Sequence, residues 1–197
     1  MGGVVRKGLI ESHINALRAS FGPVRPSIAE DELQLLYNRR DYAGMANHIR
    51  NILHLDMRVF LGLVNSGGPN APAWIAVPAV MPLFGTPAFK RLAVTMYLRK
   101  SFLAGSCFDG VVCAIAHEFC HVILDATIHP LRLQEEAVDL TAMLLGFRDF
   151  YVTGCRSVRD ASSREDILAG SRVSEIRTQG YLTYEEVGYA AEYMTFR

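Results

Sequence analysis

The first residues of the chain alternate between apolar and polar positions with a helical period. Ile10, Ile14 and Leu17 recur every three or four positions, and Gly22-Pro23 ends the pattern. This spacing places the apolar side chains on one face of a helix. The pattern therefore predicts an amphipathic helix before residue 22.

Two further helices are predicted before the chain reaches a long loop. Ser27 is followed three residues later by Glu30, a pattern that resembles a capping box, and an apolar stretch comes next. A third helix is expected over residues 42–53. The segment 65–72, Asn-Ser-Gly-Gly-Pro-Asn-Ala-Pro, contains so many turn formers that a loop is predicted. Residues 1–64 are thus expected to form a helical N-terminal part.

After this loop the pattern changes to short runs that are typical of strands. Residues 73–77, Ala-Trp-Ile-Ala-Val, are apolar and bounded by prolines, and residues 93–98, Ala-Val-Thr-Met-Tyr-Leu, are rich in β-branched and aromatic side chains. Helices are predicted next over residues 109–124 and about 131–145. A small sheet combined with separate helices predicts an α+β fold.

We expect the 197 residues to form a single domain, because the chain is too short for two domains of the usual size. The central part, residues 70–150, would hold the sheet and the longest helices. A C-terminal helical part is expected over residues 151–197. There Thr183 precedes Glu186 by three residues, and this spacing predicts a capping box at the start of the last helix.

The composition is that of a globular protein with balanced charge. Half of the residues are apolar, and 20 basic residues balance 20 acidic ones, so a basic surface for nucleic acid is not expected. No apolar run is long enough to span a membrane, and the start of the chain lacks the apolar stretch of a secretory signal. Four irregularly spaced cysteines do not indicate a disulfide framework. We therefore expect a cytoplasmic protein without a membrane or nucleic-acid partner.

The helix predicted over residues 109–124 carries the motif His-Glu-Phe-Cys-His. His117 and His121 are four residues apart, so both imidazoles emerge from one face and can bind a single zinc ion. A catalytic zinc site commonly has three protein ligands and one open position. Glu118 is the candidate general base for a water that the zinc activates. Because the helix is otherwise apolar, these polar groups would be buried, and a metal would provide their partner.

The third zinc ligand is expected from the next helix. Glu135 and Asp139 are four residues apart and share a face of that helix. Glu135 is the predicted ligand, and Asp139 would accept the free ring N–H of a metal-bound histidine. Glu136 is the competing ligand, but its side chain points about 100° away from that of Glu135.

These motifs resemble those of the gluzincin branch of the zincin metallopeptidases, in which H-E-x-x-H is followed by a helix with E-x-x-x-D. The resemblance covers residues 90–150 and implies a minimal zincin-like catalytic domain with one Zn²⁺ per chain. It also implies hydrolysis of a peptide or protein substrate. The strand around residues 95–98 would then form the sheet edge on which an extended peptide pairs. Only 13 residues separate His121 from Glu135, which indicates that the second lobe of thermolysin-like enzymes is missing.

Residues 139–147 and 180–183 are also similar to uncharacterised bacterial proteins with a predicted metallopeptidase site. Two other functions remain open at this point. One is a non-catalytic or highly specific regulatory protein of metallopeptidase fold that binds a partner protein. The other is a structural zinc that staples two helices, which would require a fourth protein ligand.

Several other polar residues could serve the site. His129, in the link between the two helices, could stabilise a transition state or simply be exposed. Tyr181 and Tyr184 could stabilise an oxyanion, and packing is the alternative role. Cys113 and Cys120 could offer a sulfur ligand, although small buried side chains at a helix interface explain them better. The histidines of the N-terminal helices are expected to be structural: His13, His48 and His54.

Overall fold

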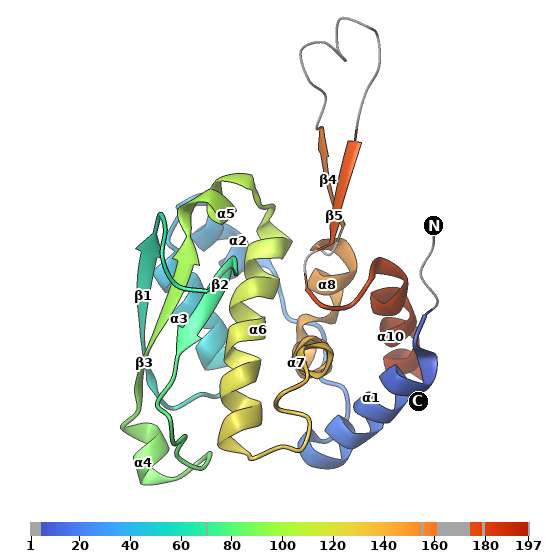
Figure 1. Ribbon diagram of the computed structural model, residues 1–197, viewed down its shortest axis with the longest axis horizontal. Helices are drawn as coiled ribbons and strands as arrows, with labels where there is room; N and C mark the ends of the chain where they lie inside the picture. The colour runs from blue at the N-terminus through green and yellow to red at the C-terminus, as the bar shows by residue number, and fades with distance from the viewer. Residues whose placement is uncertain (1–4, 70, 155, 161–173, 179, 197) are drawn as a thin grey trace, which may run out of the picture.

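The protein combines a small mixed sheet with a larger set of helices, as the computed structural model in Figure 1 shows. The structure describes residues 5–69, 71–154, 156–160, 174–178 and 180–196. The α+β fold class predicted from the sequence is confirmed.

The elements follow one another along the chain in this order: α1 (Lys7–Phe21), α2 (Asp31–Asn38), α3 (Tyr42–Ile52), β1 (Arg58–Val64), β2 (Ala73–Ala76), α4 (Pro87–Lys90), β3 (Ala93–Arg99), α5 (Lys100–Gly105), α6 (Phe108–Ala126), α7 (Glu135–Ala142), the π-helical turn η1 (Met143–Phe147), α8 (Arg148–Gly154), β4 (Arg156–Asp160), β5 (Ser174–Thr178) and α10 (Tyr184–Phe196).

The three-stranded sheet has the order β1-β3-β2, with β1 parallel and β2 antiparallel to β3. β3 is therefore the central strand. Its alternate residues Val94, Met96 and Leu98 are buried, as expected for a strand with one face on the core. The expectation that this strand forms the edge of the sheet is wrong, because β1 and β2 occupy both of its sides. β2 is the edge strand on the side of α6 (Figure 1).

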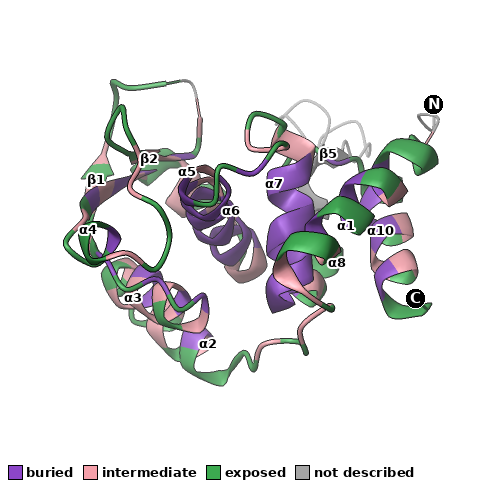
Figure 2. Ribbon diagram, turned by 90° about the horizontal axis from the view of Figure 1, so that it is seen from below, coloured by how far each residue is buried: buried purple, intermediate pink, exposed green. Residues whose placement is uncertain are grey.

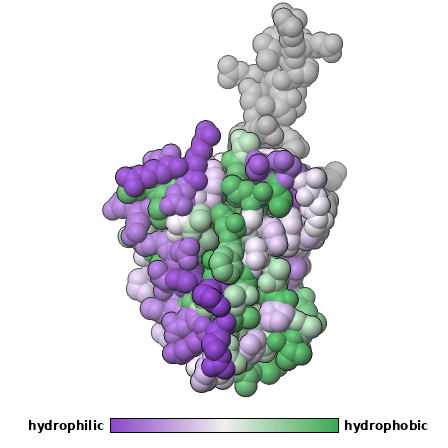
Figure 3. All heavy atoms as spheres, turned by 90° about the vertical axis from the view of Figure 1, so that its left-hand side faces the viewer, coloured by the Kyte–Doolittle hydropathy of each residue, from purple (hydrophilic) through white to green (hydrophobic). Residues whose placement is uncertain are grey.

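β1 was not anticipated, since residues 1–64 were predicted to be helical and the last helix of this part ends at Ile52. The strand lacks a clean alternation of apolar and polar residues. Phe60 and Leu63 are exposed although both are apolar, and Gly62 interrupts the apolar run. Seen from the side of β1, the molecular surface carries apolar as well as hydrophilic groups (Figure 3).

α6 lies between the sheet and the four helices α1, α7, α8 and α10. The sheet stands on one side of α6, and α7, α8, α1 and α10 stand on the other (Figure 1). Most of α6 is buried, as the purple colour in Figure 2 shows. The helix packs against the sheet on one side and against helices on the other, so apolar side chains are needed around most of its circumference. Among the described residues, no helix is both long enough and apolar enough to cross a membrane.

The helix after α6 differs from its predicted extent. α7 begins at Glu135 rather than near residue 131, and it continues through η1 into α8. Gly146 interrupts the helical backbone inside η1 with φ of 108°. The backbone N–H of Ile28 donates to the carbonyl of Gly146 at 3.2 Å, so the segment before α2 packs against this turn. The capping box predicted at Ser27 is wrong, because α2 begins at Asp31 and has no side-chain cap.

The C-terminal part is not purely helical. β4 and β5 pair antiparallel and extend away from the body of the protein beyond α8 (Figure 1). The capping box before α10 is confirmed: Thr183 N–H donates to Glu186 Oε2 at 3.0 Å, and Glu186 N–H donates to Thr183 Oγ1 at 3.3 Å. α10 then packs beside α1, so the first and the last helix of the described chain are neighbours.

Arg6 connects the N-terminus to both α7 and α10. Its Nε donates to Glu186 Oε1 at 2.7 Å, and its Nη1 donates to Glu136 Oε1 at 2.7 Å. The Glu186 side chain is only 2% exposed, so its charge depends on these partners. The hydrogen bond from Arg6 lowers the pKa of the Glu186 carboxyl from 4.5 to about 2.

Glu186→Gln is expected to lower the free energy of unfolding by about 2 kcal/mol at pH 7. Because the pKa of Glu186 is depressed in the folded state, its carboxylate stabilises the fold above about pH 4.5, and this contribution is lost as the pH falls toward about 2. The difference in the free energy of unfolding between wild type and variant should therefore become smaller as the pH falls. Urea denaturation at pH 7 and pH 3 measures it, with the exposed neighbour Glu185→Gln as control. A difference that does not change with pH would contradict this role of the carboxylate.

Candidate metal centre

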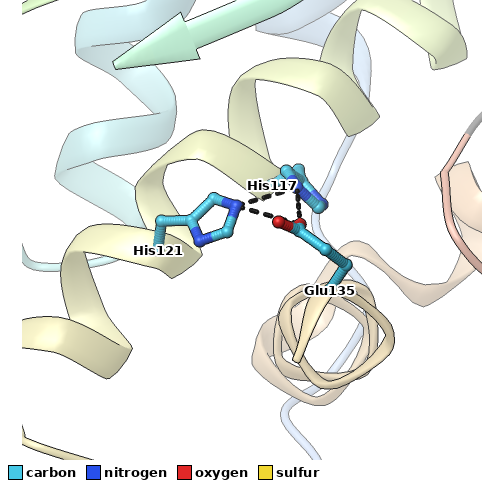
Figure 4. Close-up of side chains that lie close together, drawn as sticks. All are labelled: His117, His121 and Glu135. Atoms are coloured by element: carbon cyan, nitrogen blue, oxygen red, sulfur yellow. Dashed lines mark hydrogen bonds and ion pairs between the residues drawn. The ribbon is translucent and has the colours of Figure 1, made fainter. Parts of the chain in front are cut away.

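The two histidines of the His-Glu-Phe-Cys-His motif point from α6 toward α7. Their Nε2 atoms are 3.1 Å apart, as expected for residues four apart on one helical face. Figure 4 shows His117 and His121 from α6 converging with Glu135 from α7. Two of the three donor groups thus come from one rigid element.

Glu135 is the first residue of α7 and brings the third donor. Its Oε2 lies 3.2 Å from Nε2 of His117 and 3.2 Å from Nε2 of His121. Oε2 is shielded from solvent and receives no well-directed hydrogen bond from the described residues. A buried carboxylate oxygen without a donor requires an explanation, and a bound cation between these three groups is one.

Asp139, one turn further along α7, holds His117 from the opposite side of the ring. Its Oδ1 lies 2.8 Å from Nδ1 of His117. The same oxygen accepts a hydrogen bond from the Tyr151 hydroxyl, with 3.0 Å between the two oxygens. Its Oδ2 accepts the backbone N–H of Tyr181 at 2.7 Å. Because Asp139 accepts from Nδ1–H, the neutral form of the His117 ring carries its lone pair on Nε2, which faces Glu135 and His121.

Tyr181 reaches the site through a turn that requires glycine. Gly180 has φ of 95°, and a Cβ at this position would lie 2.8 Å from Oδ2 of Asp139. The turn places the Tyr181 ring in a stacked position against His117, with ring centroids 5.6 Å apart. Tyr181 is 56% exposed, so packing in the core is not its role.

Glu118 lies on the side of α6 that faces β2. It is 9% exposed and lines a cavity together with His117 and the residues that lead into β2. Burial raises the pKa of its carboxyl, while His117 and the backbone N–H of Ile75 lower it. A carboxyl with a raised pKa and access to a cavity is suited to taking up a proton.

The geometry of the three donors fits a divalent metal. The donor atoms of His117, His121 and Glu135 all lie within 4.8 Å of one another. For metal–ligand bonds of about 2.0–2.1 Å, a tetrahedral arrangement separates ligand atoms by about 3.3–3.4 Å. The observed separations of 3.1 and 3.2 Å are close to this value. Among the described residues, no fourth side chain joins the group.

The protonation of the histidines reflects the same arrangement. Burial opposes a charge on His117, but the carboxylates of Asp139 and Glu135 outweigh it and raise its pKa to about 10. Burial and the neighbouring charge of His117 lower the pKa of His121. Zinc binds neutral imidazole, so a metal at this centre would take the place of the proton on Nε2 of His117.

The remaining candidate residues lie elsewhere or take other roles. Glu136 turns away from the donor group and pairs with Arg6. His129 is buried and stacks on Phe21 with ring centroids 5.6 Å apart, so the expectation of an exposed residue or one facing the cleft is wrong. Tyr184 is exposed. The remaining histidines and cysteines singled out in the sequence do not belong to the donor group: His13, His48, His54, Cys113 and Cys120.

Sequence patterns did not single out Tyr151. This tyrosine is buried on α8 and is brought to Asp139 only by the path of η1 and α8. No local signal marks it, because an aromatic residue on a buried helix face has the same pattern whether or not its hydroxyl has a partner.

Comparisons of this chain with protein-family models, with curated proteins and with solved structures gave no match. What the site can do is therefore inferred from its own residues.

Proposed function

We propose that this chain is a zinc-dependent metallopeptidase of the zincin type, which hydrolyses peptide bonds with Glu118 as the general base. The observation that carries the proposal is the convergence of one donor atom each from His117, His121 and Glu135, all within 4.8 Å of one another. Two imidazoles and one carboxylate form a donor set typical of catalytic zinc, and three protein ligands leave a position for substrate or water.

Each residue at the centre has a distinct part in this reaction. Zinc in such a site acts as a Lewis acid and activates water for attack on a peptide carbonyl. The Glu118 carboxylate takes the proton of the attacking water and can pass it to the leaving amine. Asp139 keeps the His117 ring in the orientation and tautomer that direct Nε2 toward Glu135. The hydroxyl of Tyr181 is the candidate donor to the substrate carbonyl oxygen, since its ring lies beside His117.

An extended peptide would bind along β2. Since β3 is central, β2 is an edge strand, and its open side faces α6 and the cavity that Ala73 lines. Edge strands carry unpaired backbone N–H and C=O groups that can pair with a peptide. The backbone N–H of Ile75 acts on the Glu118 carboxyl, so β2 also reaches the proposed base.

Metal content and peptide cleavage together test the proposal. Elemental analysis of the purified wild type should find about one zinc per chain, and His117→Ala should retain little. Glu135→Gln and Glu136→Gln form a matched pair: the first should lose zinc, and the second should keep it. Wild type should also cleave members of a mixed peptide library. Zinc without cleavage would favour a regulatory protein that binds a partner, and a wild type without zinc would overturn the proposal.

A further inference from the structure

A second cavity lies away from the metal centre, between the turn that joins α2 to α3 and the segment of α5. Its volume is about 580 Å³, within the range of about 300–1,000 Å³ that is usual for small-molecule pockets. The lining residues come from three parts of the chain that are distant in sequence. None of them is a donor of the metal centre, so the cavity is a separate candidate site.

The cavity lies where the two parallel strands of the sheet end. Leu63, next to last in β1, pairs with Leu98 of β3, and Lys100 directly follows the last residue of β3. Leu63 and Lys100 both line the cavity. In Figure 1, α5 continues from β3 at this end of the sheet. Open sheets with parallel strands commonly bind ligands outside the carboxyl ends of those strands. The position in the fold thus favours a ligand site.

Both charged residues of the cavity wall are cations, Arg40 and Lys100. Within the part of the chain that the structure describes, neither side chain forms an ion pair or a hydrogen bond. Asp41, the acidic neighbour of Arg40, is engaged at the start of α3, where its Oδ1 accepts the N–H of Gly44 at 2.8 Å. Residues 57–108, which include Lys100, contain no Asp or Glu. Two cations without a counter-charge in one cavity favour an anionic ligand.

The backbone at Arg40 is held in a left-handed conformation, with φ of 57°. Its N–H donates to the carbonyl of Tyr37 at 2.9 Å, and the N–H of Asp41 donates to the carbonyl of Leu36 at 2.9 Å. These two hydrogen bonds form a Schellman motif, in which glycine is the usual residue at the left-handed position. An arginine at this position costs stability, and its side chain lines the cavity. The same motif ends α3 at His54, with φ of 55°, so His54 offers a matched position outside the cavity.

Aromatic and aliphatic side chains complete the cavity wall. Tyr37 and Tyr42 meet edge to face, with ring centroids 6.5 Å apart. The Tyr37 hydroxyl donates to the carbonyl of Ser106 at 2.9 Å, which holds its ring in place. Leu63 and Leu103 contribute aliphatic carbon. Tyrosine rings can pack on the flat base of a nucleotide. The cavity therefore combines cations that suit a phosphate with rings that suit a base.

We propose that this cavity binds a nucleoside phosphate, with Arg40 and Lys100 pairing with the phosphate and the base packing on the tyrosine side of the wall. Arginine binds phosphate through its planar fork, and lysine contributes a point charge. The inference does not depend on the proposed peptidase function, because the cavity shares no residue with the metal centre. Either one can therefore fail without the other.

Three related compounds test the class of ligand. Isothermal titration calorimetry of the wild-type protein should find one site per chain for AMP. Ribose 5-phosphate, which lacks the base, and adenosine, which lacks the phosphate, should each bind at least about tenfold more weakly. Adenosine with the affinity of AMP would refute the role of the two cations, and ribose 5-phosphate with that affinity would refute the role of the tyrosines. No binding of AMP at millimolar concentration would overturn the proposal.

Arg40→Gly tests the site through two opposite effects. Glycine suits the left-handed backbone, so the Tm should rise by about 2–4 °C, whereas AMP should bind about tenfold more weakly without the guanidinium. His54→Gly is the matched control, since the Tm should rise similarly and the affinity for AMP should stay unchanged. Lys100→Gln should also weaken AMP binding about tenfold, with the Tm within about 1 °C of wild type. Wild-type affinity in both Arg40→Gly and Lys100→Gln would overturn the proposal.

The position of the ligand can be measured directly by NMR. AMP should shift the methyl signals of Leu63, Leu103 and Ala104, which line the cavity. The methyl signal of Ala114, which lies at the other cavity beside the metal centre, should not move. A shift at Ala114 without shifts at the other three would show that AMP binds at the metal centre, and the proposed site would be refuted.

Discussion

Glu118→Gln is expected to lower peptide hydrolysis roughly 10³-fold while zinc remains bound at the wild-type level. The amide has the shape of the carboxylate but cannot accept a proton from water at neutral pH. The ligand atoms on His117, His121 and Glu135 are left in place. Single-turnover cleavage of a peptide that the wild type hydrolyses, with zinc measured on the same sample, gives both quantities. The variant is thus expected to bind zinc normally but to hydrolyse almost no peptide.

The control for this substitution is an acidic residue that lies outside the cavity. Glu185→Gln, on the exposed first turn of α10, should change neither the rate nor the zinc content. A Glu118→Gln protein that loses its zinc would indicate that the carboxylate supports the metal instead of the reaction. Full activity with zinc bound would assign the general base to another group.

Asp139→Ala is expected to destabilise the fold by about 3 kcal/mol or more and to weaken zinc binding 10- to 100-fold. Asp139 is 1% exposed, and its carboxylate accepts hydrogen bonds from His117, Tyr151 and Tyr181. Without it, three donors lose their acceptor in the protein interior. The His117 ring would also be free to turn or to change tautomer. Chemical denaturation and a zinc competition titration measure the two effects.

Tyr151→Phe is the matched control, since it removes one hydrogen bond to Asp139 and leaves the contact with His117 in place. This variant should lose about 1 kcal/mol of stability and bind zinc within about threefold of wild type. If Tyr151→Phe weakened zinc binding as much as Asp139→Ala, the direct contact between Asp139 and His117 would not be the cause. Wild-type zinc affinity in Asp139→Ala would contradict the assigned role of the carboxylate.

Local spacing was sufficient for the parts of the protein that depend on one helix at a time. The four-residue spacing of His117 and His121 determines that their side chains share a face, and the apolar residues around them determine that this helix is buried. Thr183 and Glu186 form their capping box because both partners lie in the same turn. The separation of Glu135 from Glu136 likewise follows from the 100° step of the helix.

Only the tertiary structure decided which segments meet. The parallel pairing of β1 with β3 joins residues about 35 positions apart and makes β3 the central strand, an order that no local period contains. Tyr151 and Tyr181 donate hydrogen bonds to Asp139 because the chain turns at Gly146 and returns to the site at Gly180. The hydrogen bond from Arg99 Nε at the end of β3 to the carbonyl of Ala71 in the loop before β2 depends on the same kind of packing. The sequence alone determined that His117 and His121 share one helical face, whereas the meeting of Glu135 with them, and everything that surrounds the three groups, depends on the packing of distant elements.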